Sequence, residues 1–289
     1  MTDIKTIEEA LYSYIPKNTI YEKNLVDSMR YSMEAGGKRI RPTLTLAFAE
    51  LLGATAKEAM PFACAVEMIH TYSLIHDDLP CMDDDDMRRG KPSNHKVYGE
   101  DIALLAGDAL QSLAFDTMTL DETIDLSGYE KACKCVSILS RYCGTIGMVG
   151  GQVIDLEYEN KNATLDIITE MDKKKTGGLI KAACLMGCVV GNANSDELLA
   201  AEKYAENIGL AFQIVDDILD VTSTEQELGK PIGSDAENNK TNYVTELGID
   251  ECKALVDKLT IEAIESLSVF KGDTSYLVTL AKKLATRTN

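Results

Sequence analysis

The placement of its prolines limits the fold of this chain more than any other feature. The six prolines are Pro16, Pro42, Pro61, Pro80, Pro92 and Pro231. None lies between residues 93 and 230, a span dominated by Ala, Leu, Ile, Met, Glu and Lys. These residues favour helices, whereas a proline inside a helix removes a backbone hydrogen bond. Alternating strand patterns are scarce, and Asn-Gly and Asp-Gly hairpin turns are absent. We therefore predict an all-α chain.

The breaks between the expected helices are short, and none looks like a linker between domains. They fall at residues 34–42, 51–55, 81–100, 120–130, 175–178, 191–197 and 227–243. Hydrophobic residues make up 45% of the chain, which is enough for one large core. We expect a single domain over residues 1–289, built from about ten or more helices.

The net charge of the chain argues against some classes of binding partner. It has 29 basic and 47 acidic residues, a net charge of -18. Nucleic acids and anionic membranes both require a broad positive surface, so neither is expected as a general partner. A small anion held in a local basic pocket is still compatible with this composition.

The cysteines and the N-terminal segment indicate the cellular compartment in which the protein is expected. The eight cysteines are Cys64, Cys81, Cys133, Cys135, Cys143, Cys184, Cys188 and Cys252. No pair has the C-x-x-C spacing of a zinc or redox site, and most have apolar neighbours, so we expect buried, reduced thiols. The N-terminal segment is acidic where a secretory signal would be basic, and no apolar run approaches the ~18 residues of a membrane span. We expect a cytoplasmic protein without a stable membrane anchor.

The stretch "HDDLPCMDDDDMRRG", residues 76–90, is unusually rich in aspartate. Carboxylates this close together repel strongly unless a cation neutralises them. The preceding residues have a helical pattern, and Pro80 should open that helix, so that Asp83 loops back beside Asp77. Oxygen ligands grouped in this way suit Mg²⁺, which usually also shares a phosphate of the substrate. The stretch therefore predicts a magnesium site that holds a phosphorylated ligand.

A second cluster, "FQIVDDILD", spans residues 212–220. On a helix, a polar stripe forms from Gln213, Asp216, Asp217 and Asp220. The opposite face is apolar and contains Ile208, Ala211, Phe212, Val215, Ile218 and Leu219. An ordinary amphipathic surface helix would show the same pattern. Because apolar residues also border the stripe, the wall of a wet cavity is an equal alternative.

Basic residues recur at the breaks between helices. Besides Arg88 and Arg89, they are Lys38, Arg39, Arg41, Lys173, Lys174, Lys175, Lys230 and Lys240. Helix caps and solvated lysines would account for any one of them, but their concentration at loops of an acidic chain favours phosphate binding. Several such clamps beside a magnesium cluster predict a diphosphate ligand, and two of them at once.

Several long motifs, taken together, resemble the trans-isoprenyl diphosphate (polyprenyl) synthase family. In chain order they are "GGKRIRP", "SLIHDDLPCMDDDDMRRGKPSNHKVYGE", "LAGDALQ", "GMVGGQVIDL", "KTGGLI", "FQIVDDILD" and "LGKPIGSD". They extend from about residue 30 to about residue 245. The first aspartate motif reads DDxxxxD, which is similar to that of the bacterial farnesyl diphosphate synthases. The resemblance implies a helical bundle around a central active-site cavity, and a homodimer.

The resemblance also implies roles for individual residues. Magnesium, three ions per site, would be bound by Asp77, Asp83, Asp216 and Asp220, with Asp78 in support. The allylic diphosphate would be held by Arg88, Lys175, Lys230 and Lys240, with Thr176 and Gln213 at its reacting end. Isopentenyl diphosphate would be held by Lys38, Arg41, His70 and Arg89. The implied reaction joins the two substrates head to tail and needs no proton transfer to free the first diphosphate.

The length of the product is expected to depend on the residues just before the first aspartate motif. In the family, the positions that influence it correspond to Tyr72 and Ser73. A large aromatic at the former resembles the farnesyl synthases, so we expect farnesyl diphosphate as the product. A geranylgeranyl or longer-chain synthase is the alternative within the family.

Three further classes of protein also compete with this prediction. "HD" at His76 and Asp77 would suit a metal phosphohydrolase of the HD type, but the chain has only one further pair of histidines, His70 and His95. A terpene cyclase normally carries Asn, Ser or Glu in its second metal motif. A non-catalytic helical protein would use the aspartates to bind Ca²⁺ or merely to stay solvated. Turnover that depends on metal separates it from the enzymes.

Overall fold

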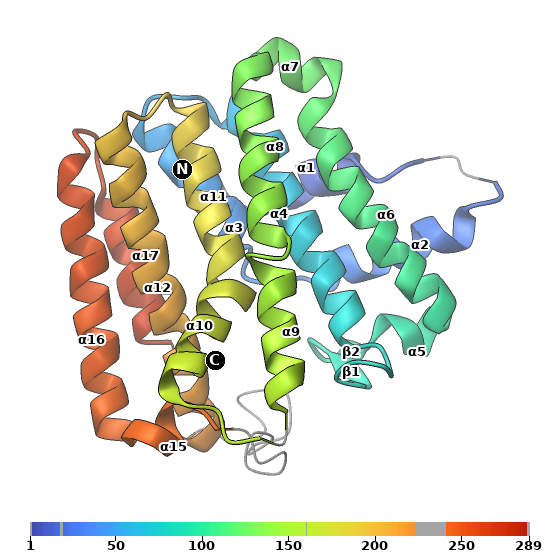
Figure 1. Ribbon diagram of the computed structural model, residues 1–289. Helices are drawn as coiled ribbons and strands as arrows, with labels where there is room; N and C mark the ends of the chain where they lie inside the picture. Colours follow the sequence, from blue (N-terminus) through green and yellow to red (C-terminus); the bar gives the residue numbers. More distant parts are fainter. Residues whose placement is uncertain (1, 18–19, 160, 223–240, 288–289) are drawn as a thin grey trace.

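In its described part, the chain is almost entirely helical, as predicted (Figure 1). The computed structural model describes residues 2–17, 20–159, 161–222 and 241–287. The longer helices are α1 (Ile4–Ser13), α2 (Lys23–Met33), α3 (Ile40–Leu51), α4 (Ala56–Asp77), α6 (Glu100–Thr119), α8 (Tyr129–Cys143), α9 (Met148–Tyr158), α10 (Leu165–Lys175), α11 (Gly177–Val190), α12 (Ser195–Thr222), α16 (Ile249–Ser266) and α17 (Ser275–Ala285). The short ones are α5 (Asn94–Tyr98), α7 (Asp121–Ser127), α15 (Tyr243–Leu247) and the 3₁₀ turn η1 (Leu267–Val269).

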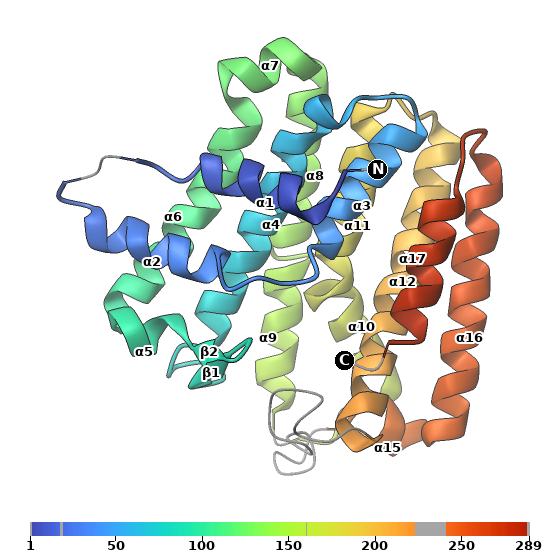
Figure 2. The same ribbon diagram turned by 180° about the vertical axis from the view of Figure 1, so that it is seen from behind.

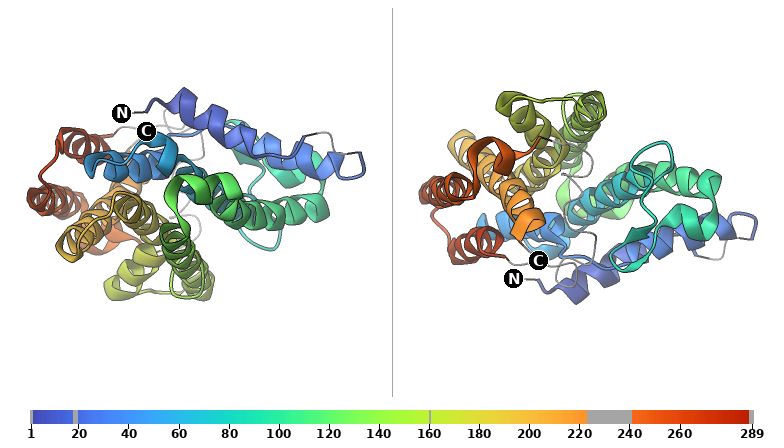
Figure 3. Two further views of the ribbon diagram at one scale, coloured as in Figure 1. Left: turned by 90° about the horizontal axis from the view of Figure 1, so that it is seen from above. Right: turned by 90° about the horizontal axis from the view of Figure 1, so that it is seen from below.

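Helix α4 lies at the centre of the bundle. It packs against α3, α6 and α11, while α12 packs against α11 and α16. The helices from α8 onward run side by side, many of them seen end-on in Figure 3. Helices α1 and α2 cross the other face, in front of α4 and α6 in Figure 2. Because α4 is enclosed, its buried residues are spread around its whole circumference instead of forming one stripe.

The ends of α4 follow from its sequence. Thr55 caps its first turn in a reciprocal arrangement with Glu58, whose carboxylate accepts from the Thr55 backbone N–H. Pro61 lies within the helix, which continues past it. The helix ends at Asp77, just before Pro80, as predicted. The carboxyl ends of α4 and α12 both lie at the lower end of the molecule in Figure 1.

A small second core fixes the carboxyl half of α12. The apolar face expected there is buried at Ile208, Ala211, Val215 and Leu219. The last three pack with residues of α10, α15 and α16, separately from the main core. Buried apolar contacts on one side therefore leave the aspartate stripe of α12 on the other.

Three short elements fall inside segments expected to be breaks. Helices α5 and α7 are two of them, and the third is a hairpin of β1 (Met87–Arg88) and β2 (Lys91–Pro92). The hairpin was not predicted, because its turn lacks Asn-Gly and Asp-Gly. Its two central residues are Arg89 and Gly90, whose φ angles of 53° and 73° meet the requirement of a type I′ turn for positive φ.

The expectation of buried thiols is confirmed for most of the cysteines. All eight cysteines are free; six are buried, and Cys81 and Cys133 are exposed. Among the described residues, no helix combines the length and the apolar character that crossing a membrane requires.

A buried ion network ties the N-terminal helices to α4. The side chain of Arg39 is fully buried and donates to Glu67 of α4 at 2.9 Å and to the Met33 carbonyl of α2 at 2.7 Å. It also pairs with Glu8 of α1 at 3.1 Å. Arg39 was one of several basic residues at loops that pointed to phosphate binding, but its donors are occupied within the protein. Its role here is structural.

We predict that Arg39→Met lowers the free energy of unfolding by about 3–5 kcal/mol, because it leaves the Glu67 carboxylate buried without its partner. Urea denaturation followed by circular dichroism measures the change. The double variant Arg39→Met/Glu67→Leu should recover part of the loss, since it removes the unpaired charge as well. Equal stability of Arg39→Met and the wild type would contradict this role.

Candidate active site

The loop after α4 returns Asp83 to the end of that helix. The Asp83 backbone N–H donates to the Asp77 carbonyl at 2.9 Å. The N–H groups of Met82 and Asp84 both donate to the Leu79 carbonyl, which closes the loop around Pro80. The two aspartates, six residues apart in the sequence, are thus brought to one place, as the loop was predicted to do.

The charge of this loop is not balanced from within. The pKa of the Asp77 carboxyl is raised to about 6, mainly by burial and further by the negative charge of Asp83. The positive charges of Lys175 and Arg88 oppose the shift without cancelling it. A buried carboxylate beside a second one is a ligand set for a hard divalent cation. The residues present therefore fit Mg²⁺.

Lys175 supplies the nearest fixed positive charge. Its ammonium lies 2.6 Å from a carboxylate oxygen of Asp155 in α9. Burial lowers the pKa of Lys175, but the charges of Asp155, Asp77 and Asp83 together raise it above its usual value, so it stays protonated. Gly151 permits this contact between α9 and α10, because a Cβ there would lie 2.2 Å from the Lys175 backbone nitrogen.

The aspartates of α12 face two different surroundings. The Asp217 carboxylate accepts the Tyr243 backbone N–H at 2.8 Å and lies near Asp172 of α10. Burial, and then the charge of Asp217, raise the pKa of Asp172 well above its ordinary value, although a hydrogen bond from Gln213 opposes this. Asp217 therefore helps to hold α12 and α15 together.

Asp216, in contrast, meets the C-terminal segment. One of its carboxylate oxygens lies 2.7 Å from a guanidinium nitrogen of Arg287. The same arginine donates to the Phe212 carbonyl at 2.8 Å, and its guanidinium carbon lies 3.7 Å from the centroid of the Phe212 ring. Arg287 thus forms an ion pair with the carboxylate that was predicted to bind magnesium.

The four residues expected to hold isopentenyl diphosphate line one pocket, which we call the basic pocket. It has a volume of roughly 370 Å³, and its lining includes Lys38, Arg41, His70, Arg89 and Phe212. These come from the segment before α3, from α3, α4, the hairpin and α12. Residues far apart in the sequence thus converge on a single concave surface.

The electrostatics of the basic pocket favour an anion. Burial lowers the pKa of Arg41 to about 10, so its guanidinium still carries a proton at neutral pH. Burial, followed by the charges of Arg41 and Arg89, lowers the pKa of His70 well below its usual value, so the imidazole is neutral. The Arg41 Nε is buried without a hydrogen-bond partner among the described residues. An anionic ligand would satisfy such a donor.

The lining of the basic pocket includes sequence neighbours of both aspartate clusters. Phe212 lines it from α12, four residues before Asp216, and Arg89 lines it from just after the first cluster. The charges of Arg287 and Asp216 act on Lys38 within the same region. Lys175 acts on the pKa of both Asp77 and Asp172, and Asp172 lies near Asp217 of the second cluster. Both clusters therefore lie within electrostatic reach of one lysine and not on distant surfaces.

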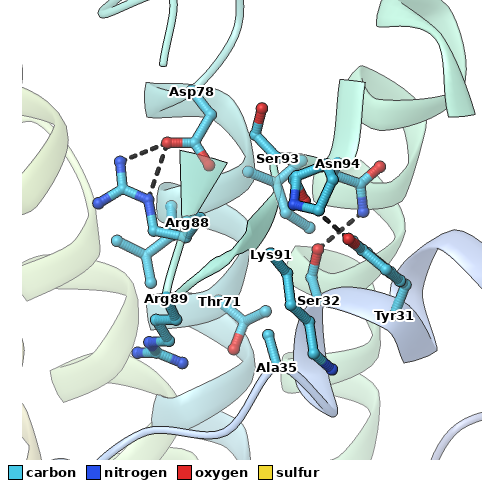
Figure 4. A pocket seen from close by; sticks show the side chains of 13 residues that line it. Tyr31, Ser32, Ala35, Thr71, Asp78, Arg88, Arg89, Lys91, Ser93 and Asn94 are labelled. Carbon is cyan, nitrogen blue, oxygen red and sulfur yellow. Dashed lines mark hydrogen bonds and ion pairs between the residues drawn. The ribbon is translucent and has the colours of Figure 1, made fainter. Parts of the chain in front are cut away.

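Arg88, in strand β1, and Asp78, just after α4, face one another (Figure 4). Two guanidinium nitrogens of Arg88 donate to one oxygen of Asp78, whose side chain is only 3% exposed. The cavity beside them has a volume of about 20 Å³, which is too small for either expected substrate. Asp78, expected to support the metal, is here a partner of Arg88, and Arg88 also pairs with Asp85 at 3.1 Å.

The two positions expected to influence product length lie on α4. Tyr72 is buried and packs edge-on against the His76 ring, with 5.5 Å between ring centroids. Its hydroxyl is buried and makes no hydrogen bond of ordinary geometry with a described residue, although Gln111 of α6 lies nearby. The Ser73 hydroxyl donates to the His70 carbonyl within the helix.

The remaining predicted residues are placed as follows. Thr176 and Gln213 are half-buried, the former at the junction of α10 and α11 and the latter beside Asp172. Asp220 lies one turn beyond Asp216 on α12. Lys230 and Lys240 lie outside the described residues.

The histidines do not form the ligand set of an HD-type site. His76 packs against α6, and its Nε2 lies 3.0 Å from the Leu104 carbonyl. His70 lines the basic pocket, and His95 is the second residue of α5, beside the hairpin. A metal phosphohydrolase would require these side chains to converge, and among the described residues they do not.

Sequence reasoning missed four residues of the site, namely Glu67, Asp155, Asp172 and Arg287. Asp155 lies inside the motif "GMVGGQVIDL", and Asp172 lies three residues before Lys175, so both had a local signal. Glu67 falls in an apolar helix, where an isolated carboxylate implies a buried partner. Arg287 had no signal, because its contact with Asp216 depends on the path of α16 and α17.

Comparison with known proteins identifies relatives along the whole chain. The model of the family "Polyprenyl synthetase" matches residues 22–277. The large subunit 1 of a heterodimeric chloroplastic geranylgeranyl pyrophosphate synthase from Arabidopsis thaliana is 43% identical over 100% of this chain and 78% of its own. A geranylgeranyl diphosphate synthase from Cyanophora paradoxa is 45% identical over 98% of this chain and 93% of its own.

Similarity to solved structures is equally extensive. The crystal structure of an FPP/GFPP synthase from Zymomonas mobilis superposes with a TM-score of 0.85 at 35% identity. The match covers 97% of this chain and 95% of that one. The all-helical architecture is thus shared over the full length of both proteins.

The raised pKa of Asp77 predicts how magnesium binding depends on pH. Only the ionised carboxylate binds the cation, so below about pH 6 the affinity for Mg²⁺ should fall about tenfold per pH unit. Isothermal titration of the protein with Mg²⁺ and inorganic diphosphate, at pH values on either side of 6, measures this. In Asp77→Asn the dependence should be weaker, and an equal pH dependence in both proteins would contradict the assignment.

Proposed function

The chain belongs to the polyprenyl synthetase family, and on that premise we propose that it condenses isopentenyl diphosphate with dimethylallyl or geranyl diphosphate to give farnesyl diphosphate. One observation carries this proposal. The pocket that Lys38, Arg41, His70 and Arg89 line also includes Phe212, which lies about one turn before Asp216 on α12. A site with metal-binding carboxylates on one side and a separate set of basic side chains on the other suits two diphosphates at once.

The first step is the loss of diphosphate from the allylic substrate. We propose that Asp77, Asp83 and Asp216 hold Mg²⁺, with Asp220 in support and three ions per site. When bound, Mg²⁺ neutralises the charge that develops on the departing diphosphate. Lys175 is protonated, close to Asp77 and half-buried, so it can contribute to the same neutralisation. Arg88, in strand β1 of the hairpin, would give up its ion pair with Asp85 and bind a phosphate oxygen instead.

Isopentenyl diphosphate is proposed to bind in the basic pocket. Arg41 and Arg89 offer charged donors, and Arg41 Nε has no partner among the described residues. His70 is neutral there, so it acts as a hydrogen-bond donor and not as a charge. Lys38 adds a cation at the rim. Held in this way, the double bond of the bound molecule can attack the allylic cation and form the new carbon–carbon bond.

The cation must be kept from water until that bond has formed. Thr176 and Gln213 are half-buried at the reacting end, where their side-chain oxygens can stabilise positive charge without attacking it. The surrounding helices present apolar side chains, which limit the entry of water. After bond formation, the positive charge lies on the third carbon of the isopentenyl unit. A proton then leaves the second carbon, which forms the new double bond, with the released diphosphate as the proposed acceptor.

Product length is proposed to depend on Tyr72. The side chain is large, buried and placed about one and a half turns before Asp77 on α4. A growing chain that passes along α4 would meet it. Burial raises the pKa of Tyr72 to about 12, so the hydroxyl stays neutral. These features favour the fifteen-carbon product, while the names of the two relatives described above favour the twenty-carbon one.

The expected homodimer and the compartment belong to the same proposal. Val97, Leu104 and Leu105 are exposed apolar side chains on the consecutive helices α5 and α6, and a second copy would cover them. The cysteines are all free and mostly buried, which suits a reducing, cytoplasmic location.

Incubation with Mg²⁺, isopentenyl diphosphate and a labelled allylic primer, followed by sizing of the product, tests the function directly. We expect condensation in the wild type and a loss of at least about a hundredfold in Asp77→Asn and Asp216→Asn, because each removes a ligand that stabilises the leaving diphosphate. Asp116→Asn, a similar change at an exposed position of α6, should retain activity. Condensation that survives both active-site changes, or hydrolysis alone in the wild type, would refute the proposal.

We further predict that Tyr72→Ala shifts the main product from fifteen to twenty or more carbons, because it removes a large side chain from the path of the growing chain. Tyr72→Phe keeps the ring and should keep the product. Chromatography of the hydrolysed products gives both answers. An unchanged product in Tyr72→Ala would show that another residue ends the chain, and a twenty-carbon product in the wild type would favour the alternative synthase.

A further inference from the structure

A second group of ligand atoms lies outside the proposed active site, at the base of the hairpin. One carboxylate oxygen each from Asp84 and Asp86 and one ring nitrogen of His95 all lie within 4.8 Å of one another. Asp77, Asp83 and Asp216 do not form such a compact set among the described residues. Three convergent ligand atoms of this kind are a starting point for a metal site, but exposed carboxylates alone would not be evidence for one.

His95 provides the independent observation. The residue is only 6% exposed, and its Nε2 is buried without a hydrogen-bond partner among the described residues. Its Nδ1 lies 3.3 Å from the Ser93 hydroxyl, which donates its own proton to the Asp85 carbonyl at 2.5 Å. The Ser93 oxygen is therefore left to accept a proton from Nδ1. In that tautomer Nε2 carries the lone pair, as a metal ligand requires.

The backbone around His95 is held in place before any ligand arrives. The neighbouring Asn94 is buried and bonds to Ser28 and Ser32 of α2, at distances between 2.7 and 2.9 Å. The Ser93 backbone N–H donates to the Asp86 carbonyl at 2.9 Å. His95 is thus fixed on a rigid element, while Asp84 and Asp86 are exposed and able to adjust.

We propose that Asp84, Asp86 and His95 form a binding site for a transition-metal ion of the Zn²⁺ or Co²⁺ type, separate from the magnesium of the active site. A ring nitrogen with two carboxylates suits such ions, whereas Mg²⁺ prefers oxygen ligands. Ligands bonded at about 2.1 Å lie roughly 3 to 4 Å apart, so the exposed carboxylates need to move by only about an ångström. Lys96 lies 2.6 Å from Asp86 Oδ1, which leaves Oδ2 for the metal.

The site has a defined place in the fold. Asp84 and Asp86 precede strand β1, and His95 follows strand β2, so a metal ion would join the two ends of the hairpin. Between these ends lie Arg88 and Arg89, of which the latter lines the basic pocket. A bound ion would restrict the movement of both arginines. The site requires no prenyl transfer, and its existence is independent of the proposed function.

Titration of the full-length protein with Co²⁺, followed by visible absorption and isothermal calorimetry, tests the site. All variants are made in the background Asp77→Asn/Asp216→Asn, which removes ligands of the proposed active site. Co²⁺ binding measured in this background therefore reports on the Asp84, Asp86 and His95 site and does not depend on the proposed function. We expect one Co²⁺ per chain, with an absorption spectrum that indicates nitrogen ligation. Asp84→Asn/Asp86→Asn should weaken binding more than about tenfold, and His95→Gln should do the same.

Asp85→Asn is the matched control, because it removes an exposed charge from the same loop without touching the ligand set. It should bind Co²⁺ as the background does. Since His95 is buried, its variant is compared only if circular dichroism shows that it is folded; the exposed aspartates supply the test otherwise. Co²⁺ binding unchanged in Asp84→Asn/Asp86→Asn, or a spectrum abolished by an excess of Mg²⁺, would overturn the proposal.

Discussion

The structure depends on one electrostatic problem, the gathering of carboxylates that the protein does not neutralise by itself. Burial and Asp83 raise the pKa of Asp77, and the nearby cations Lys175 and Arg88 only partly oppose the shift. In the second cluster, the carboxylate of Asp216 forms an ion pair with the guanidinium of Arg287. In both places a positive charge is held close to an aspartate, but at Asp77 the effect of burial outweighs it and the pKa of the carboxyl stays raised. A divalent cation bound with an anionic ligand would neutralise these carboxylates.

The fold can hold these charged groups close together because the helices that carry them are fixed by large apolar cores. Helices α4 and α12 end at the same side of the molecule, and their apolar residues are packed in two cores. The segment before α3 is anchored by buried Arg39, so Lys38 and Arg41, on either side of it, are presented to the basic pocket. One buried arginine thus supports the fold, while its two neighbours are available to a ligand.

Much of this could be predicted from the sequence, and the rest depends on contacts that no local pattern encodes. The proline-free span and the helix formers predicted the all-α fold, and Pro80 predicted where α4 ends and the aspartate loop begins. The same reasoning grouped Arg39 with ligand-binding residues, because a buried ion pair with Glu67 leaves no trace in local sequence. The hairpin was missed because Arg89 and Gly90 replace the usual turn residues. The position of Arg287 on Asp216 could not be foreseen, since it depends on how the last two helices pack.

The central claim is that both aspartate clusters bind the same diphosphate through shared metal ions. A double-mutant cycle on Mn²⁺ binding in the presence of inorganic diphosphate, followed by the electron paramagnetic resonance of free Mn²⁺, tests it most directly. If the claim holds, Asp77→Asn and Asp216→Asn each weaken binding that depends on diphosphate, and the double variant is far less affected than the sum of the two predicts. Strictly additive losses, as expected of two independent sites, would contradict it.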